Sequence, residues 1–375
     1  MRALSMLLVA VQSLKQPDNY ILVSTPSRSM ITVYQPGGNR TQVLLSKGLV
    51  EPYGMAIDDS NGRLYIADPG AGQILMTKLK TITEGGERKL QTHGGLISIK
   101  RGVQVRNMAC DFRGDLYFSD EAKNQILRIS SGQLDMMAKS EQPVVDDRPQ
   151  EELIGMEKIP DPRITTVFTR PNTTMISAPG GIAVDATVDG FMFWANKKEG
   201  ETAGSLTRAL LGNFSAAPES MGFFGENTYG VCLTHNNVFT TSKEKHIRAI
   251  PKRGGESHII TESLITPRGC AFDGDGSVYV ADWTGNAVYS VPGNMLKLGP
   301  QNETKVFEVE APYGMAMYHA PEQKSSTLAS VESAVGWGST SSSSSGSSSA
   351  TTLDGRSSAA GLGVTAVLVT LVALM

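Results

Sequence analysis

A short motif recurs six times along this chain of 375 residues. Each copy has a proline or a small residue, a variable residue, usually a glycine, then an apolar pair, and most copies end on an aspartate. The copies lie at 52–58, 105–111, 179–185, 228–233, 267–273 and 311–317. Gly54 and Gly314 occupy equivalent places 260 residues and five steps apart, which gives a mean period of 52. Repetition on this scale indicates an architecture in which each unit buries its apolar surface against its neighbours.

A β-hairpin is predicted after each of the first five copies. In the clearest case the turn residues 273–276 (Asp-Gly-Asp-Gly) precede the apolar runs 278–282 and 287–291. Asp-Gly next to alternating apolar residues is a strong hairpin signal. A further β-type run, such as 305–309, precedes most of the following copies. Each period is therefore expected to hold four strands, a to d in chain order, and we expect no helix in the middle of the chain.

The two incomplete units at the ends complement each other. The sixth copy, at 313–318, has no hairpin after it, whereas the runs 20–24, 30–34 and 41–46 read as strands b, c and d with no strand a before them. Five complete units and these two fragments make six blades. We predict an all-β fold over residues 20–320, a six-bladed β-propeller with four-stranded blades, closed by pairing the N-terminal strands b, c and d with the C-terminal strand a.

The motif resembles that of the NHL-repeat family of six-bladed propellers. Its pattern is Pro-x-Gly-(apolar)-Ala-(apolar)-Asp followed by Gly-x-(apolar)-Tyr-(apolar)-Ala-Asp, and residues 267–291 match it best. The segment 193–196 (Phe-Trp-Ala-Asn) is instead similar to the YWTD type of lipoprotein-receptor propellers. The resemblance covers residues 20–320 and implies the fold. It leaves the function open, because propellers host enzymes, receptors and scaffolds alike.

The residues that open strand a are expected to form a ring at one mouth of the central channel, since strand a lines the channel in propellers of this class. The b–c loops border the same mouth. The predicted binding residues are Tyr53, Arg106, Asn107, Tyr229, Arg268, Tyr313 and Trp283, with Gly180 in the ring and Arg28, Lys123, Lys197, Lys198, Lys243 and Lys245 around it. Arginine and aromatic residues are enriched at binding hot spots, so this mouth would suit a carboxylate, a sulfated glycan or an acidic peptide loop. The competing interpretation is that the tyrosines pack against neighbouring blades and the lysines are solvated loop residues.

A catalytic role is the less favoured interpretation. The similar senescence-marker lactonases and paraoxonases hold Ca²⁺ with Glu, Asn and Asp side chains, and the peptide-amidating lyases hold zinc with histidines, but the predicted mouth offers Asn107 among mostly Tyr, Gly and Arg. None of the five histidines opens a strand a, and the sequence has no HExxH, P-loop or GxSxG motif. Asp68, Asp120 and Asp282 end strand b in three blades and are expected to cap turns. We therefore expect a binding module without a cofactor that recognises a protein or a glycan; a Ca²⁺-dependent hydrolase of the lactonase type is the alternative.

The three cysteines all fall in predicted strands a. Cys232 and Cys270 lie in adjacent blades on opposite strand faces, so a disulfide between them is one interpretation and two buried thiols is the other. Because three is an odd number, Cys110 or another thiol stays unpaired or bonds a second chain.

The two ends of the chain differ from the repeat region. Residues 1–13 resemble a short secretory signal peptide, with a buried first strand as the alternative. Residues 321–347 form a Ser/Thr-rich segment expected to be a disordered stalk. Residues 348–375 have the spacer and apolar tail of a GPI-attachment signal, and the attachment candidates are Ser345, Gly346 and Ser347. The prediction is a monomer at the cell surface, anchored to the membrane by a lipid; a tail-anchored helix and a secreted form are the alternatives.

Charge and glycosylation motifs complete the expectation. The 34 Lys and Arg residues against 37 Asp and Glu residues give a net charge of −3, which argues against nucleic-acid binding. Asn-x-Ser/Thr sequons occur at Asn39, Asn172, Asn213 and Asn302. All four are expected between strands c and d, on the face opposite the predicted mouth. The segment 130–162 is a long insertion between two strands of the second complete unit.

Overall fold

The computed structural model of this protein describes residues 19–321, apart from residue 39, the segment 141–160, and residues 171, 186, 188–189 and 198–203. The predicted signal peptide, stalk and GPI signal lie outside the described residues, and so do Asn39 and Lys198. Within the described part, no helix combines the length and the apolar character that crossing a bilayer requires.

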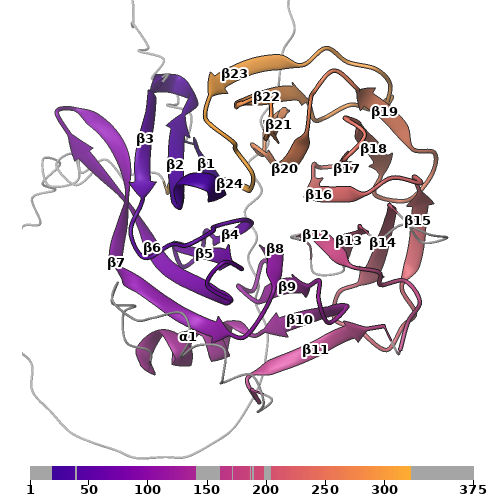
Figure 1. Cartoon of the computed structure of the whole chain (residues 1–375), viewed down its shortest axis with the longest axis horizontal. Helices are drawn as coiled ribbons and strands as arrows, with labels where there is room; N and C mark the ends of the chain where they lie inside the picture. Colours follow the sequence, from indigo (N-terminus) through magenta and orange to yellow (C-terminus); the bar gives the residue numbers. More distant parts are fainter. Residues whose placement is uncertain are drawn as a thin grey trace, which may run out of the picture. The chain divides into compact units, whose positions relative to one another are not determined.

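The strands form six four-stranded antiparallel sheets, which are arranged around a central axis as the blades of a propeller (Figure 1). From the innermost strand outward, blade 1 consists of β24 (Met315–His319), β1 (Asn19–Thr25), β2 (Met30–Gln35) and β3 (Arg40–Leu45). Blade 2 consists of β4 (Met55–Asp58), β5 (Arg63–Asp68), β6 (Gln73–Glu84) and β7 (Glu87–Arg101). Blade 3 consists of β8 (Val105–Cys110), β9 (Leu116–Asp120), β10 (Gln125–Ile129) and β11 (Ile164–Thr169).

Blades 4 to 6 follow the same order without interruption. Blade 4 consists of β12 (Pro179–Val184), β13 (Phe191–Asn196), β14 (Ser205–Leu210) and β15 (Glu219–Phe223). Blade 5 consists of β16 (Thr228–Leu233), β17 (Asn237–Ser242), β18 (Ile247–Pro251) and β19 (His258–Thr261). Blade 6 consists of β20 (Pro267–Phe272), β21 (Ser277–Asp282), β22 (Ala287–Pro292) and β23 (Thr304–Glu308). The predicted six-bladed propeller is confirmed.

Burial follows the position of a strand within its blade. The second strands are buried on both faces, as in β5 and β17, because a neighbouring blade covers each side. The outermost strands, such as β3 and β15, are largely exposed. In the described part of the chain the buried apolar residues form six clusters, each drawn from two adjacent blades. The core is therefore a ring of interfaces between blades, and no blade buries its apolar faces alone.

The ring closes through the two ends of the described chain. The last strand, β24, pairs antiparallel with β1, with Asn19 opposite His319 and Val23 opposite Met315. The rings of Tyr20 and Tyr318 pack together across this pair, with centroids 6.3 Å apart. This confirms that blade 1 combines the C-terminal strand a with the N-terminal strands b, c and d.

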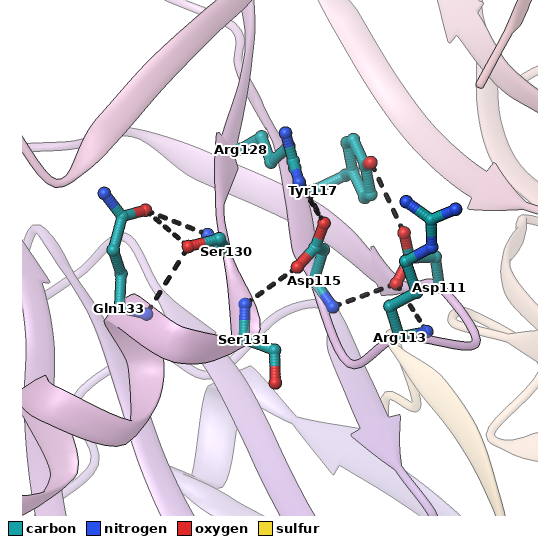
Figure 2. A network of polar contacts seen from close by, with 8 residues as sticks. All are labelled: Asp111, Arg113, Asp115, Tyr117, Arg128, Ser130, Ser131 and Gln133. Carbon is teal, nitrogen blue, oxygen red and sulfur yellow. Dashed lines mark hydrogen bonds and ion pairs between the residues drawn. The ribbon is translucent and has the colours of Figure 1, made fainter. Parts of the chain in front are cut away.

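The insertion after β10 contains a helix that contradicts the expectation of no helix in the middle of the chain. Helix α1 spans Ser131–Ser140 and buries Leu134 and Met137. Figure 2 shows how its start is fixed: Gln133 Oε1 accepts hydrogen bonds from the amide and the hydroxyl of Ser130, a capping box. The Ser131 amide donates to Asp115 Oδ1 at 2.8 Å, and Asp115 also pairs with Arg128. With only two buried apolar positions three residues apart, the helix has too weak a periodicity to be visible in the sequence.

Candidate binding site at the channel mouth

The motif glycine allows neighbouring strands a to approach closely at the mouth. A Cβ added to Gly54 would lie 2.6 Å from the carbonyl oxygen of Arg106 in the next blade. At Gly230 the same atom would lie 2.3 Å from the Arg268 oxygen. The Gly54 amide instead donates a hydrogen bond to the Arg106 oxygen at 3.0 Å. Because each glycine contacts the residue before the next blade's glycine, the variable positions are drawn into one ring.

This ring contains, from blade 1 to blade 6, Tyr313, Tyr53, Arg106, Gly180, Tyr229 and Arg268. All except Tyr53 line one cavity at the mouth, together with Asn107, Lys197 and the glycines Gly54, Gly181, Gly230, Gly269 and Gly314. The space that water can occupy within it is about 20 Å³, enough for one or two water molecules. Tyr53 and Trp283 lie against this lining, so the structure brings all seven predicted binding residues together.

Each arginine of the mouth lies against aromatic rings. The guanidinium carbon of Arg106 lies 4.5 Å from the ring centroid of Tyr53, which packs edge-on against Tyr313 at 4.3 Å. On the other side, Arg268 lies 4.1 Å from the Tyr229 centroid and 5.1 Å from that of Trp283. Cation–π contacts of this kind hold each guanidinium beside an aromatic ring.

Lys197 occupies the place that a side chain at Gly180 would take. A Cβ on Gly180 would lie 2.7 Å from Lys197 Cδ. The Lys197 ammonium donates to Glu121 Oε2 at 2.7 Å, and the same oxygen lies 3.4 Å from Arg106 Nε. Burial lowers the pKa of Lys197, and Arg106 and Arg268 lower it further by repulsion, while Glu121 opposes the shift. Glu121 was not among the predicted residues; its only sequence signal was its place in a b–c loop.

Arg268 has no carboxylate partner among the described residues. Its side chain is almost covered, with 8% of the residue exposed, and its buried Nη1 has no hydrogen-bond partner in the described part of the chain. Burial raises the pKa of the neighbouring Tyr313 to about 12, although Arg268 and Arg106 act against the shift, so its hydroxyl is neutral near pH 7. Three cationic side chains thus line the cavity, and two of them, Arg106 and Lys197, lie within 4 Å of the Glu121 carboxylate.

The aspartates at the ends of strands b hold the loops that border the mouth. Asp282 accepts hydrogen bonds from the amides of Ile265 and Thr266, both at 2.8 Å. Asp68 does the same for Val50 and Glu51, at 2.7 and 2.8 Å. Asp120 accepts from the amide of Lys123 at 3.2 Å. The predicted capping role of the three aspartates is confirmed, and none of them lines the cavity.

Three large apolar side chains are exposed at the rim that these loops form. Val50 and Ile265 are 46% and 49% exposed, each two residues before a motif proline, and Trp283 in a b–c loop is 42% exposed. The backbone amide of Trp283 donates to the Thr266 carbonyl at 3.0 Å, which places Trp283 beside Ile265. The other basic loop residues do not line the cavity: Arg28, Lys123, Lys243 and Lys245 are exposed, and Arg28 forms an ion pair with Glu310.

The innermost strands of blades 5 and 6 are covalently linked. Cys232 on β16 and Cys270 on β20 form a disulfide, with Cα atoms 5.7 Å apart. Of the two interpretations of these cysteines, the pairing is therefore confirmed. Cys110 on β8 is a free thiol, and burial raises its pKa well above the ordinary value.

The mouth does not fit the Ca²⁺ site of the enzymatic alternative. Ca²⁺ is bound by six to eight oxygen ligands, several of them carboxylates. Here Glu121 is paired with Lys197, and Asn107 Oδ1 accepts a hydrogen bond from the adjacent Met108 amide at 2.8 Å. Among the residues that the structure describes, no group of three or more His, Cys, Asp or Glu side chains is arranged to hold a metal ion.

Two described sequons lie where they were expected and one does not. Asn213, between β14 and β15, and Asn302, between β22 and β23, are exposed in c–d connections. Asn172 follows β11, the outermost strand of blade 3, so it lies in a d–a connection on the mouth side. The expectation for Asn172 was wrong because the long insertion lies between strands c and d of this blade, and strand d (β11) ends before Asn172.

Comparisons with known proteins agree with the fold. No family model matches the chain, and no curated protein matches it. The chain is a six-bladed β-propeller. Among solved structures, a chain of the nidogen/laminin complex is similar at 11% identity with a TM-score of 0.56, over 80% of this chain and 98% of that chain. Virginiamycin B lyase from Staphylococcus aureus follows at 16% identity and a TM-score of 0.44, over 72% of this chain and 77% of that chain. At these identities the likeness extends to the fold alone.

Proposed function

We propose that this protein is a binding module that docks a partner protein on the mouth face of its propeller. The observation that carries the proposal is the coincidence of two features on that face. The ring of arginines and tyrosines lies inside a rim on which Val50, Ile265 and Trp283 expose apolar surface. Protein interfaces concentrate their binding energy in aromatic and arginine residues at the centre of an apolar patch.

Fold relationships are compatible with this role. The solved structure with the higher TM-score contains nidogen in a complex with laminin, so a propeller of this shape occurs in a protein–protein complex. We also propose, from the Pro-x-Gly motif, that the blades are of the NHL-repeat type. A protein partner is favoured over a glycan because Val50, Ile265 and Trp283 expose apolar surface on the rim.

We further propose that the protein acts at the cell surface, with a signal peptide and a GPI anchor. The disulfide between Cys232 and Cys270 supports this location, because structural disulfides persist mainly in oxidising compartments. Glycans on Asn213 and Asn302 would lie on the face opposite the mouth, whereas a glycan on Asn172 would lie on the mouth side. Phosphatidylinositol-specific phospholipase is expected to release the protein from intact cells; retention on the cells after treatment would contradict the anchor.

Site-specific photo-crosslinking tests the docking face. Trp283 or Ile265 is replaced by p-benzoylphenylalanine in the full chain on living cells. The matched control carries the same residue at Leu296, which is 94% exposed between β22 and β23 on the opposite face. The two mouth positions should crosslink the same protein, and an excess of soluble wild-type propeller should suppress the product. Crosslinking from Leu296 alone, or from none of the three positions, would overturn the proposal.

A further inference from the structure

We infer that the mouth contains a subsite for a single carboxylate group centred on Arg268, and that the docked partner supplies this carboxylate from an acidic side chain. The existence of the subsite is independent of the proposed function; only the source of the carboxylate rests on it.

The positive charge that lines the cavity is not fully compensated. Arg106, Lys197 and Arg268 all line it. Glu121 lies within 4 Å of Arg106 and Lys197, at 3.4 and 2.7 Å, and it forms no ion pair with Arg268. Among the described residues, Glu121 is the only carboxylate that forms ion pairs with these three cations, and the repulsion between the cations is weakly screened in a partly desolvated space. A second carboxylate would relieve this repulsion.

Arg268 carries a buried hydrogen-bond donor that is not satisfied by the described residues. A buried charged group without a hydrogen-bond partner is costly, and Arg268 Nη1 is such a group in the described part of the chain. The side chain is not free to turn toward solvent, because it lies against the rings of Tyr229 and Trp283. Its backbone is fixed as well, since its carbonyl oxygen accepts a hydrogen bond from the Thr241 hydroxyl. The donor is therefore held in place for an acceptor that the described residues do not supply.

The shape of the cavity favours a small planar acceptor. The free space of about 20 Å³ is narrow, and six glycines form part of its wall. The amides of Gly230, Gly269 and Gly314 already donate to Thr241, Tyr313 and Ser24, so they do not form a cradle for a tetrahedral anion. Among the side chains that line the cavity, Arg268 has a buried donor without a partner, and its planar guanidinium matches the two oxygens of a carboxylate. A carboxylate fits this geometry better than a phosphate or a sulfate.

Trp283 provides a spectroscopic reporter for the subsite, because its ring lies 5.1 Å from the Arg268 guanidinium. Sodium acetate is titrated into the full-length protein at constant ionic strength, with sodium chloride as the balancing salt, and tryptophan fluorescence is followed. We expect a saturable change that is lost in W283F, which assigns the signal. Arg268→Gln should weaken acetate binding at least tenfold, and Lys197→Gln should weaken it less. Arg253→Gln, an exposed arginine between β18 and β19 on the opposite face, should leave it unchanged.

Several outcomes would overturn the inference. One is the absence of a saturable response in the wild-type protein, which needs no variant to be folded. Another is an equal response to sulfate or phosphate, which would indicate a general anion site. If R268Q does not fold, Arg268→Lys keeps the charge and removes the planar fork, and undiminished acetate binding by it would contradict the geometry. Saturable acetate binding without a crosslinked partner would refute only the docking function. A partner whose crosslinking R268Q leaves unchanged would refute only the inference that the partner supplies the carboxylate.

Discussion

At the scale of single residues, blade 5 fixes the loop before its innermost strand with other side chains than the aspartate that blades 2 and 6 use. Ser242 stands where blades 2, 3 and 6 have a capping aspartate, and it donates to Glu226 at 2.9 Å. Glu226 comes from the preceding loop and also accepts hydrogen bonds from His246 and Arg248. Burial alone would raise the pKa of Glu226, but these hydrogen bonds outweigh it and hold the pKa below its ordinary value. The loop before β16 is therefore fixed by a carboxylate, as in blades 2 and 6, although the carboxylate lies elsewhere in the sequence.

A second residue-scale contact makes the stability of the closure depend on pH. His319, at the end of β24, binds Asp59 Oδ2 through Nδ1 at 3.1 Å and the Asp273 carbonyl through Nε2 at 3.2 Å. The hydrogen bond with Asp59 raises the pKa of His319 above its ordinary value. The protonated form is thus favoured in the folded state. Its contribution to stability is complete below about pH 6.5 and is lost as the pH rises through the raised pKa.

We predict that the coupling between His319 and Asp59 is larger at pH 5.5 than at pH 8.5. The two side chains are 40% and 46% exposed, so the coupling free energy should stay below about 1 kcal/mol at the lower pH. A double-mutant cycle of wild type, H319Q, D59N and the double variant, measured by urea unfolding at both pH values, isolates it. An equal coupling at the two pH values would refute the prediction.

At the scale of elements, the decisive feature is the short distance between neighbouring innermost strands. Gly230 on β16 approaches the Arg268 carbonyl of β20, and the Cys232–Cys270 disulfide joins the same two strands. A side chain at the motif glycine would meet backbone, which cannot move aside as a flexible side chain can. The arrangement explains why five of the six motif copies have a glycine there, with Asn107 as the exception, and why the following apolar pair can pack between blades.

Gly230→Ala is predicted to destabilise the propeller by about 2 kcal/mol or more, because its Cβ would lie 2.3 Å from the Arg268 oxygen. The same change should alter the fluorescence of Trp283, which stacks on Arg268. The matched control is Gly276→Ala in the turn before β21, where an added Cβ has no atom within 4 Å. Denaturant midpoints of both variants test the prediction, and equal midpoints would contradict it.

At the scale of the whole molecule, the propeller depends on a strand contributed from the far end of the domain. Without β24, the inner edge of β1 would expose unpaired backbone groups, and the clusters on both sides of blade 1 would lose members such as Ala316 and Met317. Closure is therefore a condition for the stability of all six blades rather than for one of them.

We predict that a chain ending at Glu310 does not form a protease-resistant monomer, whereas a chain ending at Pro321 does. A synthetic peptide covering residues 311–321, added in trans, should restore resistance to the shorter chain by supplying β24. Limited proteolysis and circular dichroism measure both effects. Full resistance of the shorter chain without the peptide would show that the closing pair is dispensable.

The number of blades, their four strands, the closing pair and the membership of the mouth ring were determined by the sequence alone. These features depend on local signals, namely the alternation of apolar residues, the turn residues and the spacing of a repeated motif. Such signals can be recognised in the sequence without knowing how the blades pack. Tertiary structure decided which side chains meet: Lys197 in the place left by Gly180, Glu121 between two cations, Arg268 without a partner, and Cys232 bonded to Cys270. It also placed Asn172 on the mouth side and added a helix within the insertion. These outcomes depend on the distance and twist between blades. Packing across the whole ring sets both quantities, so they cannot be recognised in the sequence of a single repeat.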